Sequence, residues 1–241
     1  MIVTPGPLDA PAGRLLAALV ARGERVVDAA AVPVGAEPVT LAISTGAFVF
    51  DFAGMVRALG TRPFRVVMLS RLGAHPDAKA DGLRRLWRME EHVRRGGAPT
   101  LTLRFAPLVG PQSPLWRWLG TGPALPRQGR QLLNPVAESD AVETLARAVG
   151  LTQPVLADAH FRDWYEVAGP DVMSLAELRD LAVRSAKRGT PDRARFSGAG
   201  GALEPSEAEM REHRLAQSEP WASRFGITPV SIAAEAMRWA A

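Results

Sequence analysis

Side chains that could act as acids, bases or nucleophiles are few and far apart in this sequence. The chain has 241 residues, with four histidines, one tyrosine and no cysteine. His75 follows the apolar run 65–69, where it could serve as an acid or a base at the end of a strand. The alternative is a histidine in a solvated loop. His75 is therefore a candidate for proton transfer that needs a structural test.

Metal and hydrolase chemistry have little support. Cysteine is absent, so thiolate metal sites and disulfides are excluded. No two histidines form a His-x-x-x-His or Glu-x-x-His pair with a convincing third ligand. The sequence also lacks a Gly-x-Ser-x-Gly elbow, so a hydrolase triad would have no nucleophile. We expect no metal site.

The elements that must position these residues alternate between strands and helices in the first half of the chain. Continuous apolar runs of strand length are typical of strands buried on both faces of a parallel sheet. Helical spacing of apolar residues separates them. The expected strands are 2–4, 25–27, 40–43, 65–69 and 101–105, and the expected helices are 15–21, 52–59 and 81–95. This order predicts an α/β fold with a doubly wound parallel sheet.

The second half has a different composition, and it is rich in Pro, Gly and Trp directly after Gly110. We expect this part to form a small C-terminal lobe over the carboxyl edge of the sheet. Helices are predicted at 139–149, 174–188 and 230–239, a strand at 164–167, and a loop at 193–205. The predicted division is a core over 1–110 and a lobe over 111–241 that returns elements to the sheet, the two forming one integrated domain.

Composition and charge restrict the function classes. The isoelectric point near 10.5 reflects arginine in place of lysine, because 29 basic residues face 25 acidic ones and the net charge is +4. The densest basic stretch, 84–95, also contains Glu90 and Glu91, which is typical of a solvated helix face. We therefore expect no nucleic-acid binding. No apolar run reaches the roughly 20 residues that span a bilayer, and no signal peptide is apparent, so we expect a cytoplasmic protein without a membrane span.

Residue strings along the chain recur in a recognisable order. They are Ile-Val-Thr at 2–4, Gly-Arg-Leu-Leu at 13–16, Val-Val-Met-Leu-Ser at 66–70, Glu-Glu-His-Val-Arg at 90–94, the segment 103–111, Asn-Pro-Val at 134–136 before Ser-Asp-Ala-Val at 139–142, Tyr-Glu-Val-Ala-Gly-Pro at 165–170 before 174–178, and Phe-Gly-Ile-Thr-Pro at 225–229. This series resembles the extended and atypical short-chain dehydrogenase/reductases, the NAD(P)-binding, epimerase-like branch. The resemblance implies a Rossmann-like core and a substrate held under a C-terminal lobe.

The same resemblance implies a dinucleotide cofactor, NAD or NADP, bound on a glycine loop at the start of the first helix. Here the loop is about two residues longer than in the family, and only Gly6 and Gly13 match its glycines. Prolines at 5, 7 and 11 remove N–H donors, and Asp9 places an anion near the helix N-terminus. The loop is either an ordinary strand-to-helix turn capped by Asp9 or a modified phosphate loop.

Asp28 closes the second predicted strand, where the family often places an acidic residue against the adenosine ribose. In that role it would favour NAD over NADP; otherwise it is a turn residue. The segment from Asp28 to Val39 is too short for the family's usual helix and third strand. Part of the wall around the adenine is therefore expected to be missing.

The family's catalytic pair is absent from the expected helix 81–95. In the family, a tyrosine donates the proton and a lysine four residues later lowers its pKa. Here Gly82 or Leu83 stands at the tyrosine position, and Leu86 or Trp87 stands at the lysine position. The single tyrosine, Tyr165, falls in a C-terminal string. Ser70 matches the family's hydroxyl position after the strand, either as a catalytic group or as an ordinary strand-end serine. Arg104 is expected to pair with backbone carbonyls or with an acid.

Two functional hypotheses follow. The first is a relative that has lost standard dehydrogenase catalysis and serves as an interaction, assembly or regulatory protein. The second is an active NAD(P)-dependent oxidoreductase or sugar-nucleotide epimerase with a substituted acid or base. The helix 81–95 is the predicted contact for a homodimer or another protein, through Leu83, Leu86, Trp87 and Val93. The alternative is that these side chains cover the subunit's own sheet.

Overall fold

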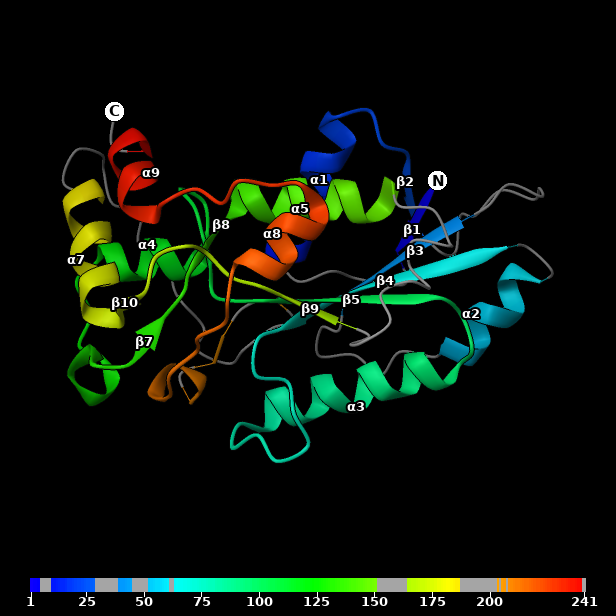
Figure 1. Cartoon of the computed structure of the whole chain (residues 1–241), viewed down its shortest axis with the longest axis horizontal. Helices are drawn as coiled ribbons and strands as arrows, with labels where there is room; N and C mark the ends of the chain where they lie inside the picture. Colours follow the sequence, from blue (N-terminus) through cyan, green and yellow to red (C-terminus); the bar gives the residue numbers. More distant parts are fainter. Residues whose placement is uncertain are drawn as a thin grey trace.

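The fold is a parallel sheet with helices on both faces and a small lobe at one end (Figure 1). The computed structural model describes residues 1–4, 10–28, 39–44, 52–60, 63–150, 164–186, 203, 205–206 and 208–239. The predicted Rossmann-type α/β class is confirmed. Among the described residues, no helix is long and apolar enough to cross a membrane.

Six parallel strands form the sheet in the order β2-β1-β3-β4-β5-β9. Their bounds are β1 Ile2–Thr4, β2 Val26–Asp28, β3 Val39–Ser44, β4 Phe64–Arg71, β5 Thr100–Phe105 and β9 Trp164–Val167. The predicted strands are thus confirmed, with ends shifted by one or two residues. β1 lies between β2 and β3, so the chain reverses its direction of strand addition there, and ligands of such sheets bind outside the carboxyl ends at this point.

Helices cover the two faces of the sheet in separate groups (Figure 1). One face carries α1 Ala10–Ala21, α5 Glu138–Gly150 and α8 Glu219–Phe225, and the other carries α2 Phe52–Leu59 and α3 Asp81–Arg95. The bounds predicted for α2 and α3 are confirmed. α1 begins five residues before the predicted start, because proline is tolerated in the first helical turn and Pro11 is the second residue of this helix.

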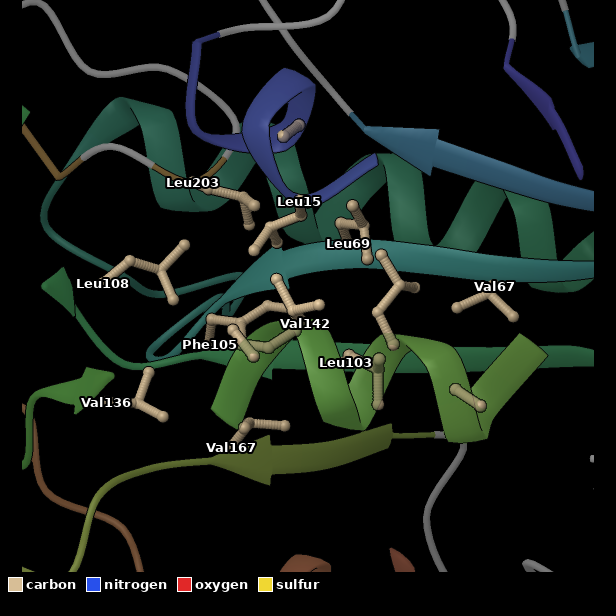
Figure 2. Close-up of a cluster of buried hydrophobic side chains, with 14 of the residues drawn as sticks. Leu15, Val67, Leu69, Leu103, Phe105, Leu108, Val136, Val142, Val167 and Leu203 are labelled. Carbon is tan, nitrogen blue, oxygen red and sulfur yellow. The ribbon is translucent and has the colours of Figure 1, made fainter. Parts of the chain in front are cut away.

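The core is divided by the alternation of side chains along the strands. In β4, Val67 and Leu69 point into a cluster shared with α1 and α5, whereas Val66 and Met68 belong to a second cluster with Val93 of α3. Figure 2 shows the first cluster, in which Leu69 lies beside Leu15 and Leu103. Because β4 is buried on both faces, its sequence is continuously apolar from Val66 to Leu69.

The C-terminal lobe has a core of its own and several short elements. These are β6 Leu108–Val109 paired with β8 Val136–Ala137, β7 Leu132–Leu133 paired with β10 Met173–Ser174, the helices α4 Pro114–Gly120, α7 Leu175–Ala186 and α9 Ile232–Trp239, and the 3-10 helices η2 Pro126–Gly129 and η3 Glu209–Arg211. In this core Trp116 meets Trp239 edge to face at 5.0 Å between ring centroids. The two-residue strands were not predicted, because their pairing partners are far away in the sequence.

Elements after residue 110 also complete the sheet core. β9 pairs with β5, and α5 packs on α1. The predicted boundary between 110 and 111 stays a prediction. The loop predicted at 193–205 lies mostly outside the described residues.

Candidate functional site

The carboxyl ends of β4 and β5 carry two buried arginines, Arg71 and Arg104. Each is paired in register with a residue of the neighbouring strand, Arg71 with Phe105 and Arg104 with Ser70. A buried guanidinium is tolerated only where a carboxylate and hydrogen bonds compensate its charge. The partners of these two arginines therefore define what this edge of the sheet can do.

Arg104 is compensated by Glu90 of α3. Its Nε lies 3.1 Å from each carboxylate oxygen, and its Nη2 donates to Oε2. Ser70 Oγ donates to Glu90 Oε1 at 2.6 Å, and the indole of Trp164 stacks on the guanidinium with 4.0 Å from its Cζ to the ring centroid. Arg104 thus has the expected acidic partner. Ser70 is fully buried in this network and binds a structural carboxylate.

Arg71 is compensated by Glu209, which comes from η3 in the lobe. Arg71 Nη1 lies 3.0 Å from Glu209 Oε2, and both side chains are almost fully buried. Ser206 Oγ donates to the other carboxylate oxygen at 2.9 Å. This pair joins residues 138 positions apart in the chain. It therefore attaches the lobe to the carboxyl end of β4.

Gly82 on α3 lies directly against this ion pair. A Cβ placed on Gly82 would be 2.9 Å from Arg71 Nη2 and 3.2 Å from Glu209 Oε1. The first distance is shorter than real Cβ contacts, so a larger residue would require the end of the Arg71 side chain to shift. Glycine at position 82 thus leaves the space that the Arg71–Glu209 pair occupies.

A pocket adjoins the pair between the sheet and the lobe. Its wall is mostly apolar, with Arg71, Glu209 and Arg214 as the charged side chains. The full lining is Arg71, Leu72, Phe105, Ala106, Pro107, Leu133, Leu203, Pro205, Glu209, Met210 and Arg214. This pocket presents charged groups on a concave surface at the carboxyl edge of the sheet.

The segment that closes this pocket is fixed to the lobe by backbone hydrogen bonds. Arg214 N donates to Leu132 O at 2.9 Å, and Arg214 O accepts from Asn134 N at 3.1 Å. Asn134 Oδ1 also accepts from Ala216 N at 3.1 Å. Lys79 lies 2.9 Å from Glu212, and its hydrogen bond lowers the pKa of that carboxyl. The segment 208–216 is therefore an ordered wall.

Neither position of the expected catalytic pair carries suitable chemistry. Leu83 and Leu86 are buried in a small cluster with Ala74 and Ala80, and Trp87 packs on that cluster. Tyr165 lies on β9 and packs edge to face on Phe225, 5.4 Å between ring centroids. The described residues place no phenol beside an ammonium on α3.

Of the candidate cofactor residues, the structure describes Gly13 and Asp28. Gly6 lies outside the described residues, as does Asp9. Gly13 is inside α1, and a Cβ added there would have no neighbour within 4 Å. Asp28 ends β2, exposed, in register with Thr4 of β1. Next to Gly13, Arg14 donates to Glu138 Oε1 at 2.6 Å, so an internal carboxylate already occupies this guanidinium.

The predicted shortage of sheet on the adenine side stays a prediction. β2 is the edge of the described sheet, whereas the common dinucleotide-binding order 3-2-1-4-5-6 has a further strand beyond it. Residues 29–38 lie outside the described residues.

His75 stands apart from the pocket. Its side chain is 63% exposed, with Nδ1 accepting from Asp77 N at 3.2 Å and lying 3.7 Å from Asp77 Oδ2. It does not line the pocket. Among the described residues, no group of three or more His, Asp or Glu side chains could hold a metal ion.

Sequence reasoning missed Arg71, Glu209 and Arg214. Arg71 adjoins the singled-out Ser70, so a basic residue at the end of a strand was the available signal. Glu209 is one of several glutamates in an irregular stretch and had no distinguishing feature. Its contact depends on how the lobe folds back over the sheet.

Solved structures with the same fold cover nearly the whole chain. A UDP-glucose 4-epimerase of Thermus thermophilus in complex with NAD matches with a TM-score of 0.64 and 15% identity, covering 96% of this chain and 95% of that one. A UDP-glucuronic acid 4-epimerase of Bacillus cereus matches at 0.63 and 10% identity, covering 98% and 96%. TunA, an NAD-dependent NDP-hexosamine 5,6-dehydratase of tunicamycin biosynthesis, matches at 0.59 and 15% identity, covering 99% and 96%.

These matches show that the chain has the Rossmann fold of NAD-dependent epimerases and dehydratases, in agreement with the resemblance in the sequence. No family model matches the sequence, and no curated protein does. At identities of 10 to 15%, the likeness extends to the fold alone.

Proposed function

We propose that this chain is a Rossmann-fold protein that has lost hydride-transfer catalysis through a tyrosine and a lysine, and that it acts by binding a protein partner. Its role would then be interaction, assembly or regulation. The fold itself is compatible both with catalysis and with binding alone, so the function depends on the residues at the carboxyl edge of the sheet.

The observation that supports this proposal most strongly is the Arg71–Glu209 pair against Gly82. In the family a phenol on this helix must reach the substrate hydroxyl. Here the position has no side chain, and the space that a Cβ would enter is bounded by a guanidinium 2.9 Å away. If the register is taken one residue later, Leu83 occupies the position and is fully buried. In both registers a proton donor on α3 is missing.

The amino end of α1 supports the proposal independently. A diphosphate bound there needs backbone N–H donors and the positive end of the helix. The sequence places prolines at 5, 7 and 11 and an aspartate at 9 in this region, and Arg14 is already engaged by Glu138. We therefore expect weak or absent binding of any nicotinamide dinucleotide.

The second candidate is an active NAD-dependent epimerase or oxidoreductase with a substituted acid or base. Asp28 favours it, because this side chain is exposed at the carboxyl end of β2, where a ribose would be held. The likeness to epimerases with NAD in their structures also favours it. His75 would have to supply the proton from its exposed loop.

Isothermal titration of the full chain with NAD, NADH, NADP and NADPH separates the two candidates. We expect no heat of binding at protein concentrations of about 50 µM, where a micromolar dissociation constant would be plain. A dissociation constant of about 1 µM or tighter for any of the four would overturn the proposal. Asp28→Ala should then abolish that binding, whereas Asp180→Ala, an exposed aspartate on α7, should leave it unchanged.

A turnover assay is the second test that separates the two candidates. The chain is incubated with UDP-glucose and NAD, and the sugar products are separated by chromatography. We expect no epimerised sugar. Formation of product by the wild type that is lost in His75→Ala would establish the second candidate and name its proton donor.

A further inference from the structure

The outer face of α3 carries a line of basic side chains. Arg85, Arg88, His92 and Arg95 are all exposed and are spaced three, four and three residues apart. At this spacing, side chains lie on one side of a helix. From Arg85 to Arg95 the line extends about 15 Å along the axis, at 1.5 Å per residue. We call these four residues the basic stripe.

The basic stripe contributes to an excess of positive charge that is concentrated on one helix. α3 contains five arginines, and its surface carboxylates are Asp81 and Glu91, because Glu90 is buried against Arg104. Three positive charges are therefore uncompensated on this helix, out of a net charge of +4 for the chain. Asp81 and Glu91 pair with Arg84 and Arg94.

Two members of the stripe have no partner inside the described part of the protein. Arg85 and Arg88 form no ion pair and no hydrogen bond there. Arg95 lies 3.6 Å from Glu91, which is shared with Arg94. The other arginines of this edge, Arg71 and Arg104, are each compensated by a buried carboxylate. Within the stripe, Arg85 and Arg88 are thus the two arginines to which the described residues supply no counter-charge.

The apolar side of α3 is used by its own subunit. Leu83 and Leu86 are buried with Ala74 and Ala80, and Trp87 is partly buried against them. Val93 is buried with residues of the sheet. The three buried side chains are therefore not available for the predicted apolar contact with another chain. Figure 1 shows α3 at the periphery of the fold, with no described element outside it. A second copy docking on the stripe would bring like charges together, which opposes self-association.

We infer that the basic stripe docks an acidic segment of another protein; this rests on the proposed function as an interaction protein. Carboxylates three and four residues apart on a partner helix match the spacing of the stripe, and arginine binds a carboxylate with two parallel hydrogen bonds. A membrane surface is a poorer match, because an interfacial helix inserts an apolar face that α3 has already buried.

Nucleic acid is a poorer match as well. Three uncompensated charges over about 15 Å neutralise few phosphates of a duplex, which carries a charge every 1.7 Å or so. The stripe contains no Phe, Tyr or Trp, and the imidazole of His92 is its one aromatic ring on which a base could stack.

Fluorescence anisotropy with a labelled poly-L-glutamate of about 20 residues, in roughly 50 mM salt, tests the inference. Arg85→Gln/Arg88→Gln is compared with Arg25→Gln/Arg184→Gln. Arg25 and Arg184 are also exposed and unpaired in the described part, so both double variants lose the same charge. We expect the stripe variant to bind about five- to tenfold more weakly than the wild type and the control to change less than about twofold.

Three results would overturn the inference: no binding of poly-L-glutamate by the wild type, equal losses in the two double variants, or tighter binding of a 20-base-pair duplex than of the peptide. Sedimentation of the wild type should show a monomer. If the wild type were instead a dimer that Arg88→Glu dissociates, the stripe would bind a second copy of this chain and not an acidic segment of another protein. Dinucleotide titration is a separate readout, so the proposed function can fail while the stripe still binds.

Discussion

Two buried ion pairs at the same edge of the sheet differ in what they connect. Glu90 and Arg104 are 14 residues apart and join α3 to β5 within the core. Arg71 and Glu209 are 138 residues apart and join β4 to the lobe. The first pair is enclosed by Ser70 and Trp164, whereas the second borders a pocket. The Glu90–Arg104 pair therefore stabilises the core, whereas the Arg71–Glu209 pair lies in the wall of the pocket.

The difference shows that the packing of α3 on the sheet and the contact between the sheet and the lobe depend on separate ion pairs. The Glu90–Arg104 pair preserves the packing of α3 on the sheet whatever the pocket does. The Arg71–Glu209 pair lies where side chains from several elements meet, and a Cβ at position 82 would crowd it. A change at the second pair alters the pocket without dismantling the core.

The largest effect is expected for Glu90→Gln. The substitution leaves the Arg104 guanidinium buried without a counter-charge, which costs roughly 3–5 kcal/mol of unfolding free energy. Urea denaturation followed by tryptophan fluorescence measures the loss. Glu91→Gln, the next residue, removes surface pairs with Arg94 and Arg95 and should cost less than about 1 kcal/mol. Equal costs for the two variants would contradict the contrast between buried and surface pairs.

Glu209→Gln should cost less, about 2–3 kcal/mol, because water can enter from the pocket and solvate Arg71. The effect should also be local. Hydrogen exchange should accelerate in 208–216 with little change in β4 and β5, whereas Glu90→Gln should accelerate exchange in α3 and β5. If both variants gave the same global pattern, the two pairs would belong to one cooperative unit and the comparison would fail.

Gly82→Ala tests how tightly the second pair is packed. Alanine normally stabilises a helix by about 1 kcal/mol over glycine, but here its Cβ displaces Arg71 or Glu209. We expect a net destabilisation of about 1 kcal/mol by thermal unfolding. Gly13→Ala in α1 is the matched control, since its Cβ meets nothing within 4 Å and it should be stabilising. Stabilisation by both alanines would show that position 82 is not crowded.

The smallest effect is expected for Glu143→Gln, a surface reference for the buried pairs. Hydrogen bonds from Arg147 and Arg22 lower the pKa of Glu143. Because the folded pKa is below the unfolded one, the stabilisation is present above the ordinary glutamate range and disappears as pH falls through the folded pKa. At neutral pH the variant should lose about 0.5 kcal/mol, and the difference should vanish in acid. Thermal melts of both proteins from pH 7 to pH 3 measure this difference in stability. A loss that does not change with pH would show that the Glu143 side chain stabilises the fold by packing and not by its charge.

The fold could largely be predicted from the sequence because its signals are local. β4 is a continuous apolar run, and α2 and α3 have clear helical periods, so their positions follow from burial and periodicity. Short strands such as β7 and β10 could not be predicted, because two residues carry no periodicity and form a strand only when their partner is present.

Part of the candidate site could likewise be predicted from the sequence, and part could not. The absence of tyrosine and lysine from α3 is visible in the sequence, as is the arginine at the end of β5. Whether Leu83, Leu86 and Val93 face outward or inward could not be decided from an amphipathic pattern, since a partner subunit and the subunit's own sheet select the same residues. Burial in the structure places them against the subunit's own core.

The sequence by itself determined the α/β class, the order of the main elements and the loss of the expected catalytic pair, because each depends on residue type and near neighbours. Only the tertiary structure decided that Arg71 meets Glu209, that a Cβ at position 82 would crowd this pair, and that Arg85 and Arg88 meet no counter-charge among the described residues. The physical reason is that desolvation and charge pairing depend on distances between segments far apart in the chain. Those distances are fixed only when the lobe packs on the carboxyl edge of the sheet.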